Sequence, residues 1–223
     1  MKSKEITRCH WPGQDALYMK YHDEIWGVPE FDSKVLFAKL ILDGAQAGLS
    51  WITILRRQPG YEAVFDGLDP EKIARYTDKK LEKILLDERI IRNRLKVYST
   101  RTNAIAYLKM EDEGINFSEH LWSFVEGKPI VNKFRGESDF RATSPESDAM
   151  SKDLKKRGFT FVGSTIVYAF MQAVGMYNDH IVNCFRHDEV NKMQGARGKS
   201  KWSEDPAVPR ESKEKRNNDL LFH

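Results

Sequence analysis

The sequence predicts an all-α protein, and three observations support this fold class. Hydrophobic residues make up 40% of the 223 residues, which is enough for a sizeable core. Residues that favour helix N-caps stand directly before several apolar segments with helical spacing. The one β-branched run that could form a strand, 165–168, continues into Ala169, Met171, Gln172 and Ala173, which favour a helix.

The expected helices follow one another from cap to cap. Four of the eight begin at a side chain that can accept a hydrogen bond from the first turn, with a proline in the first helical position in some of them. They are expected from Asp32–Ser33, over 49–57 before Pro59, from Asp69–Pro70, from Thr77 or Asp78, over 90–110, from Phe117, from Ser144–Glu146 to Gly158, and over 163–174.

We expect a single helical domain over residues 1–186, with two lobes as an alternative arrangement, and a polar, flexible tail over 187–223. Two cysteines exclude a disulfide-rich secreted framework. The sequence offers neither a secretory signal nor an apolar run of about 18 residues, so we expect no membrane span. The expected location is the cytoplasm, with association to the nucleoid in a bacterium.

Local charge is more informative than the net charge of +3, which excludes a globally basic scaffold. Residues 79–109 contain nine basic and three acidic residues, and a second basic cluster lies at 152–157. Both clusters are compatible with ordinary solvated helix faces. The alternative is a surface that neutralises phosphates.

Two cysteines and two histidines near the ends of the chain form a candidate metal site: Cys9, His22, His180 and Cys184. His180 and Cys184 are four positions apart, which places them on one face of a helix or helical turn. Two thiolates and two imidazoles suit a tetrahedral, structural zinc with no open position. Spacing alone also allows two buried free cysteines and two unrelated histidines, since the interval from Cys9 to His22 matches no standard zinc finger.

Aromatic residues are dense in the N-terminal fifty residues and could stack against a planar ligand. Asp43 stands inside an apolar stretch, where burial would raise the pKa of its carboxyl group and where it could accept a ligand's hydrogen bonds. Gln46 could add amide donors and acceptors. An ordinary aromatic core with a solvent-facing Asp43 explains the same pattern. The aromatic candidates are Trp11, Tyr18, Tyr21, Trp26 and Trp51.

Five blocks of the sequence are distinctive: Arg8-Cys9-His10-Trp11, Tyr21-His22-Asp23 with Trp26-Gly27-Val28-Pro29, 46–53 (QAGLSWIT), 155–163 (KKRGFTFVG) and 171–180 (MQAVGMYNDH). In this order the blocks resemble the 3-methyladenine DNA glycosylase I (TAG) family. The similarity extends from about Arg8 to Cys184, nearly everything except the charged tail.

The resemblance implies a fold of the helix–hairpin–helix DNA glycosylase superfamily. It also implies one structural zinc ion that joins the N- and C-terminal segments through Cys9, His22, His180 and Cys184. The implied reaction is hydrolysis of the N-glycosidic bond of an alkylated adenine, flipped out of double-stranded DNA, which leaves an abasic site. We expect the enzyme to act as a monomer.

The resemblance assigns the base pocket to residues that the aromatic pattern had already marked. Tyr21 and Trp51 correspond to the stacking pair, and Asp43 to the carboxylate with the catalytic role. The base-binding residues are Trp11, Tyr18, Tyr21, Trp26, Gln46 and Trp51. A base that N3 alkylation has made cationic is a good leaving group, so selective binding can supply much of the rate.

The chain departs from the family pattern at two places. Asp43 stands where the family typically has a glutamate, and Ala45 where it has a second pocket glutamine. Because both side chains are shorter, the pocket is expected to be roomier on this side. The protein would then either recognise its base through a water molecule bound to Asp43 or prefer a lesion other than 3-methyladenine. The stretch 86–92, taken as the hairpin, lacks glycine, so Arg89, Arg92 and Arg94 are expected to contact the DNA backbone instead.

Two alternatives to an active glycosylase remain. The departures at Asp43 and Ala45 fit a damage-binding homologue with altered lesion specificity or weak catalysis. A zinc hydrolase or nucleobase deaminase would need an open zinc position and a His-x-Glu motif, and the sequence offers four metal ligands and no such motif.

Overall fold

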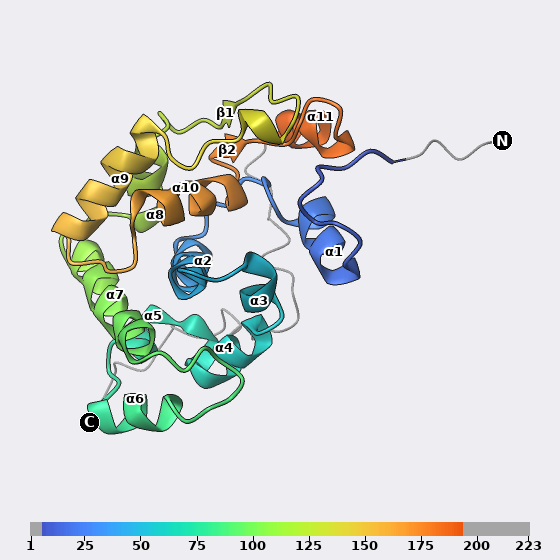
Figure 1. Ribbon diagram of the computed structural model, residues 1–223. Coiled ribbons are helices and arrows are strands. Elements are labelled where there is room, and N and C mark those ends of the chain that lie inside the picture. Colours follow the sequence, from blue (N-terminus) through green and yellow to red (C-terminus); the bar gives the residue numbers. More distant parts are fainter. Residues whose placement is uncertain (1–5, 194–223) are drawn as a thin grey trace, which may run out of the picture.

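The computed structural model of the protein describes residues 6–193, and the statements below concern this part of the chain. The fold is mainly helical, as expected (Figure 1). None of the described helices is long and apolar enough to cross a membrane. The elements are α1 (Ala16–Glu24), α2 (Ser33–Gln46), α3 (Trp51–Leu55), α4 (Gln58–Val64), η1 (Asp66–Leu68), α5 (Pro70–Ile73), α6 (Asp78–Ile84), α7 (Arg94–Asp112), α8 (Phe117–Ser123), β1 (Ile130–Val131), η2 (Glu137–Asp139), α9 (Pro145–Lys156), α10 (Ser164–Ala173), β2 (Tyr177–Asn178) and α11 (Phe185–Lys192).

Helix α2 is the centre of the fold. Figure 1 shows it almost end-on, with α10 on one side, α7 on another and α3 close by. It packs against α3, α7, α8 and α10. Most of its surface is therefore buried, including the polar side chains of Lys39 and Asp43. A helix surrounded in this way is apolar on nearly all faces, and polar residues within it need partners.

The N-caps expected from the sequence are confirmed. The side chains of Asp32, Asp69, Thr77 and Ser144 each accept a hydrogen bond from a backbone N–H of the first turn that follows. At Ser144 the contact is reciprocal, because Ser147 N–H donates to Ser144 Oγ and Ser144 N–H donates to Ser147 Oγ. The segment 163–174 forms a helix, α10, rather than a strand.

The helix expected over 90–110 begins later, at Arg94. Ile90 is buried, and the N–H of Ile91 donates to Tyr61 Oη at 3.2 Å. Both contacts hold this stretch as an extended connection, and Asn93 caps the helix instead. The helix expected over 49–57 is shorter, α3 at Trp51–Leu55, and a further helix that was not expected, α4, begins at Gln58 with Pro59 in its first turn.

Several elements were not anticipated from the sequence, among them α1, the two strands and α11. Helix α1 begins after Asp15, whose side chain accepts from Tyr18 N–H. Strands β1 and β2 pair in parallel. Helix α11 extends the described fold past the expected boundary at residue 186, and its Val190 is buried. The rest of the expected tail, from residue 194, lies outside the described residues.

The N-terminal segment is fixed against the end of α10. The N–H groups of Gly27 and Glu30 donate to Ala173 O and Val174 O at 3.3 and 3.1 Å. Gly175, with φ +74°, allows this approach, since a Cβ there would lie 2.5 Å from the backbone nitrogen of Pro29. This contact brings the aromatic N-terminal region next to α10.

Candidate functional site

The four expected metal ligands converge in the structure. Cys9, His22, His180 and Cys184 are each at most 3% exposed. Their candidate ligand atoms all lie within 4.8 Å of one another. Cys184 Sγ is 3.5 Å from His22 Nε2 and 3.6 Å from His180 Nδ1, and Cys9 Sγ is 3.6 Å from His180 Nδ1. The cluster is compatible with a metal site.

The imidazole nitrogens that face away from the cluster are held by oxygen acceptors. His22 Nδ1 donates to Asp23 Oδ1 at 2.8 Å, and His180 Nε2 donates to the carbonyl oxygen of Trp26 at 3.2 Å. Arg8 in turn binds both carboxylate oxygens of Asp23. Such partners orient ligating imidazoles. Burial lowers the pKa of His180, which favours the neutral ring that metals bind.

The cluster joins the two ends of the fold. Cys9 precedes α1 and His22 lies on α1, whereas His180 and Cys184 belong to the turn between β2 and α11. The turn is closed by a hydrogen bond from Cys184 N–H to Ile181 O at 2.8 Å. The spacing of four positions therefore corresponds to a turn rather than to a helix.

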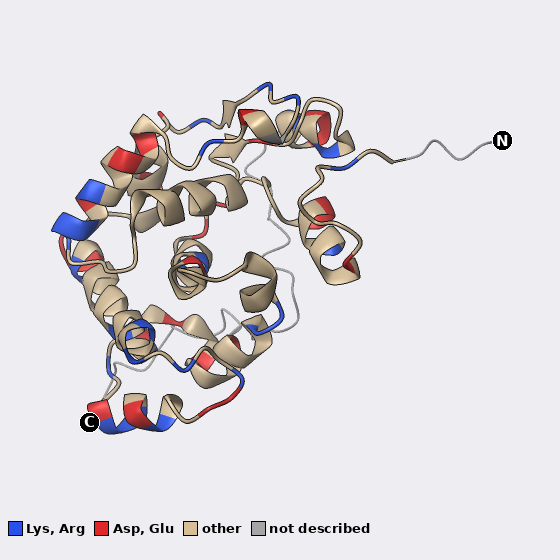
Figure 2. Cartoon of the chain, in the orientation of Figure 1, with Lys and Arg blue, Asp and Glu red and all other residues tan. Residues whose placement is uncertain are grey.

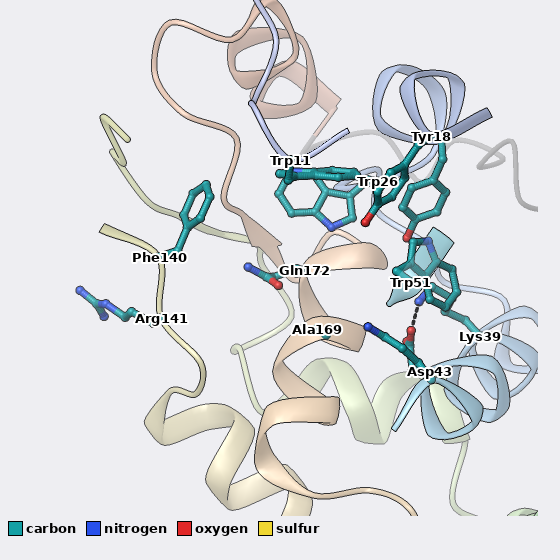
Figure 3. A pocket seen from close by; sticks show the side chains of 12 residues that line it. Trp11, Tyr18, Trp26, Lys39, Asp43, Trp51, Phe140, Arg141, Ala169 and Gln172 are labelled. Atoms are coloured by element: carbon teal, nitrogen blue, oxygen red, sulfur yellow. Dashed lines mark hydrogen bonds and ion pairs between the residues drawn. The ribbon is translucent and has the colours of Figure 1, made fainter. Parts of the chain in front are cut away.

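A cavity of about 290 Å³ lies beside this cluster. All five expected aromatic residues line it, together with Asp43 and Gln46. Figure 3 shows the rings of Trp11, Tyr18, Trp26 and Trp51 gathered on one side and Gln172 of α10 on another. The remaining lining residues, which the sequence analysis did not single out as site residues, are Lys39, Phe140, Arg141, Ala169 and Gln172.

The aromatic side chains pack against one another mostly edge to face. Trp11 is 4.7 Å from Tyr18 and 5.2 Å from Trp26 between ring centroids, at 61° and 70°. Tyr21 and Trp51 are 5.5 Å apart and inclined at 43°. A base between two parallel rings would need about 7 Å, twice the spacing of stacked bases. In this conformation Tyr21 and Trp51 thus form a wall rather than an open slot.

Asp43 lies in the cavity wall and forms an ion pair with Lys39, one turn earlier on α2. Both side chains are only 2% exposed. Lys39 Nζ donates to Asp43 Oδ1, and it lies 4.0 Å from the centre of the Trp51 ring. Asp43 Oδ2 is buried with no hydrogen-bond partner among the described residues. The cavity therefore contains an unsatisfied carboxylate oxygen beside an ammonium group.

Burial dominates the ionisation of this pair. Desolvation raises the pKa of Asp43 from 3.8 to about 6, although the Lys39 ammonium opposes the shift. Desolvation lowers the pKa of Lys39, and Asp43 opposes that shift. Desolvation also raises the pKa of the Tyr21 hydroxyl, which stays protonated and able to donate. An aromatic cavity with such a pair can hold a planar heterocycle and fix its polar edge.

The sequence contained a signal for Lys39 that the helical pattern obscured. Lys39 and Asp43 stand four positions apart in an otherwise apolar stretch, the spacing at which oppositely charged side chains meet on a helix. Gln172 had a weaker signal, because the orientation of its amide depends on Asp179, seven positions later in the chain. Its Nε2 donates to the buried Asp179 Oδ2 at 2.7 Å, which fixes the amide at the cavity.

The arginines expected to contact DNA are exposed on and beside the connection between α6 and α7. The side chains of Arg89, Arg92 and Arg94 are more than half exposed, and each is paired with a nearby acid: Asp87 at 2.7 Å, Glu88 at 3.6 Å and Glu82 at 2.6 Å. Figure 2 shows this interleaving of basic and acidic residues. Lys96 of the same basic stretch faces inward, where Nζ donates to Ala45 O and Ala47 O at the end of α2.

A second short connection between helices, from α9 to α10, contains two glycines and follows the other basic cluster, most of which lies at the end of α9. Gly158 has φ +97°, and Gly163 is the N-cap of α10. Asn103 of α7 holds the turn through both hydrogen bonds to the Thr160 backbone, at 2.8 and 3.0 Å. Lys155 and Lys156 are exposed at its edge. This connection has the glycines that 86–92 lacks, and α10 leads directly into the cavity wall.

Comparison with known proteins places these features in one family. The model of the methyladenine glycosylase family matches residues 11–187. DNA-3-methyladenine glycosylase 1 of Escherichia coli (strain K12) is 50% identical over 179 residues, which cover 80% of this chain and 96% of that protein.

Solved structures agree with this comparison. A crystal structure of 3-methyladenine DNA glycosylase I has a TM-score of 0.79 and 48% identity, covering 80% of this chain and 98% of the other. A structure that describes 3-methyladenine recognition by the Staphylococcus aureus enzyme has a TM-score of 0.78 and 33% identity, covering 94% and 100%.

Proposed function

The chain belongs to the methyladenine glycosylase family, and on that premise we propose that it repairs alkylated DNA by base excision. It is a DNA-3-methyladenine glycosylase, which hydrolyses the N-glycosidic bond of an alkylated adenine and leaves an abasic site. The observation that carries the assignment is the aromatic cavity with the buried carboxylate of Asp43.

The cavity suits a base that has left the double helix. An enzyme cannot reach the N-glycosidic bond of a stacked base, so the nucleotide must be flipped into a pocket. The aromatic wall offers apolar contact for the flipped purine. Asp43 Oδ2, which lacks a partner among the described residues, is placed to accept a hydrogen bond from the exocyclic amine of the base.

Asp43 is the proposed catalytic residue, because its carboxylate would contact the base that becomes the leaving group. N3 alkylation makes the base cationic, and a buried carboxylate stabilises that charge on binding. As the bond breaks, positive charge develops on the sugar while the base becomes neutral. The chain's own residues therefore act by binding and orienting the base and by excluding water from its polar edge.

We propose that the cluster of Cys9, His22, His180 and Cys184 holds a structural zinc ion. In a tetrahedral site with Zn–S of about 2.3 Å and Zn–N of about 2.0–2.1 Å, sulfur and nitrogen ligands lie about 3.5 Å apart. The observed sulfur–nitrogen distances of 3.5 and 3.6 Å fit this value. Four protein ligands leave no open position, so the ion would fix the aromatic N-terminal segment rather than take part in the reaction.

The DNA-binding surface is proposed from charge and position. Arg89, Arg92 and Arg94 are exposed and can exchange their acidic neighbours for phosphates. The α9–α10 connection is a second candidate, since Lys155 and Lys156 flank a glycine-containing turn next to a helix that lines the cavity. The enzyme is proposed to act as a monomer.

The test is incubation of the protein with duplex DNA methylated at random, with mass spectrometry of the bases set free. An active glycosylase releases 3-methyladenine catalytically, whereas a damage-binding homologue retains the DNA and releases no more base than the enzyme-free control. The second function is worth separating because Asp43 and Ala45 stand where the family pattern has two longer side chains, and a shorter carboxylate could bind without efficient release.

A further inference from the structure

We propose that Arg141 binds a phosphate of the flipped nucleotide and so marks where the DNA backbone passes the edge of the cavity. The inference rests on the proposed function and deepens it, because it assigns a phosphodiester-binding residue to the same site. It starts from a charged side chain that lines the cavity and that binding of the base alone does not explain.

The proposed orientation of the base determines where its sugar lies. Asp43 accepts a hydrogen bond from the exocyclic amine at C6 of the purine, and the glycosidic nitrogen N9 is on the opposite edge of the ring system. The sugar and its two phosphates therefore remain on the side of the cavity that is remote from Asp43. Figure 3 shows Phe140 and Arg141 on that side, with Gln172 between them and Asp43.

The charge of Arg141 is available for a ligand. The residue is exposed, and its guanidinium has no ion pair or hydrogen bond with any described side chain. The carboxylate of Glu146, in the first turn of α9, interacts with it only through space and accepts a hydrogen bond from Tyr177 Oη instead. The arginines of the α6–α7 connection, in contrast, must each give up an acid before they can bind a phosphate.

The segment that carries Arg141 is fixed to the rest of the fold. The ring of Phe140 packs edge to face on the buried Phe134, with 5.7 Å between the ring centroids and 64° between the planes. The carbonyl oxygen of Phe134 accepts a hydrogen bond from Val182 N–H at 2.8 Å, which ties the segment to the turn between β2 and α11. A binding residue on a fixed segment loses less conformational freedom when the ligand arrives.

A guanidinium group suits this place. Its planar fork can donate two parallel hydrogen bonds to the two non-bridging oxygens of a phosphodiester. Figure 3 shows the Arg141 side chain pointing away from Gln172 and from the aromatic rings, so it does not occupy the space of the base. The backbone of the flipped nucleotide is thus held at Arg141, while the aromatic wall and Asp43 hold the base. This contact does not depend on the identity of the base.

The experiment measures binding to a duplex with a single tetrahydrofuran residue, a stable analogue of an abasic nucleotide, by fluorescence anisotropy. The phosphate on each side of this residue is replaced in turn by an uncharged methylphosphonate. For the wild type, one of the two replacements should weaken binding about tenfold, because a charge-assisted hydrogen bond is lost. Arg141→Gln should weaken binding to the unmodified duplex by a similar factor. The same methylphosphonate should then cost this variant less than about twofold, since the contact is already absent.

Arg135→Gln is the matched control, because Arg135 is an exposed arginine of the same segment that does not line the cavity. It should keep the full methylphosphonate effect. A merely structural role of Arg141 is tested by titration with free 3-methyladenine, followed by tryptophan fluorescence. The free base has no phosphate, so Arg141→Gln should bind it as tightly as the wild type does. Equal methylphosphonate effects in the wild type and Arg141→Gln, or no effect at either phosphate, overturn the proposal.

These binding measurements need no reaction, so they separate the phosphate contact from the proposed function. If one phosphate is coupled to Arg141 but the wild type releases no base from methylated duplex, the glycosylase activity is refuted and the phosphate contact stands. If base is released but neither phosphate is coupled to Arg141, the phosphate contact is refuted and the activity stands. A wild type that does not bind the abasic analogue at all contradicts the phosphate contact as well.

Discussion

Cys184 Sγ lies 3.5 Å from His22 Nε2, although 162 residues separate them in the chain. The contact joins the segment after β2 to helix α1, which carries Tyr18 and Tyr21 of the pocket. A metal bound here would therefore stabilise the aromatic wall as well as the fold.

We expect the purified protein to contain about one zinc ion per chain by mass spectrometry. Cys184→Ser should lose most of the metal and unfold at a lower temperature, because a tetrahedral site needs all four ligands. His10→Ala changes an exposed histidine next to Cys9 and is the control. Metal-free protein with an unchanged melting temperature after chelation would contradict a structural zinc.

Release of base should depend on the ionisation of Asp43. Its pKa is raised to about 6 by burial, so the ionised fraction grows from about one tenth at pH 5 to about nine tenths at pH 7. Single-turnover rates on methylated duplex, after subtraction of spontaneous loss, should rise about ninefold over this interval. Rates that stay level between pH 5 and 7 would rule out this role for the carboxylate.

Trp51 should contribute stacking and hold Lys39 in place. Trp51→Ala is expected to weaken binding of 3-methyladenine about 10- to 100-fold, as stacking on an aromatic side chain is worth about 1–3 kcal/mol per base. Trp51→Phe keeps a ring and should lose less. Binding is measured by calorimetric titration with 3-methyladenine. Trp122→Phe is the control, because Trp122 is a buried tryptophan that packs against Phe31 and does not line the cavity. Equal affinities for the alanine and phenylalanine variants would exclude stacking on Trp51.

The two basic surfaces can be ranked by salt dependence. Each phosphate contact adds about 0.9 to the slope of log K against log salt concentration. If the α6–α7 connection binds DNA, the double substitution Arg92→Ala and Arg94→Ala should flatten the slope by up to about two. Lys155→Ala with Lys156→Ala tests the α9–α10 connection in the same way. A slope that neither pair changes would place the phosphate contacts elsewhere.

Gly175 should be essential for folding. Gly175→Ala introduces a Cβ about 2.5 Å from the backbone of Pro29 at a residue with φ +74°, and it should cost several kcal/mol in the free energy of unfolding. Gly114→Ala has a similar φ of +76° with nothing within 4 Å of the added Cβ, so it should cost only about 1 kcal/mol. Denaturant unfolding measures the loss in the free energy of unfolding for each variant. Equal losses would mean that residue 175 does not lie tightly against the backbone of Pro29.

The sequence predicted the local features of the fold better than the long-range ones. Caps such as Asp32 and Ser144 act within four residues, so their chemistry is visible in the sequence alone. The late start of α7 depends on the buried Ile90 and on Tyr61, thirty residues away from Ile91. The pairing of β1 with β2 likewise depends on chain segments that meet only in the folded protein.

In the candidate site, too, features that depend on residue type were predicted, whereas features that depend on long-range packing were not. The cysteine–histidine cluster and the aromatic wall were expected, because their residue types are chemically distinctive and because the blocks that contain them resemble one family. Lys39 was missed because a lysine in an amphipathic helix is ordinarily solvent-facing, and only the packing of α2 on several helices shows that it is enclosed. Gln172 depends on Asp179, which comes near it through the turn that follows α10.

The central claim is that the carboxylate of Asp43 holds the flipped base during bond cleavage. Single-turnover release of 3-methyladenine from methylated duplex, measured at pH 7 with wild type, Asp43→Asn and Asp43→Glu, tests it most directly. The account predicts a loss of about a hundredfold or more for Asp43→Asn and substantial activity for Asp43→Glu. Equal rates for the wild type and Asp43→Asn would contradict it.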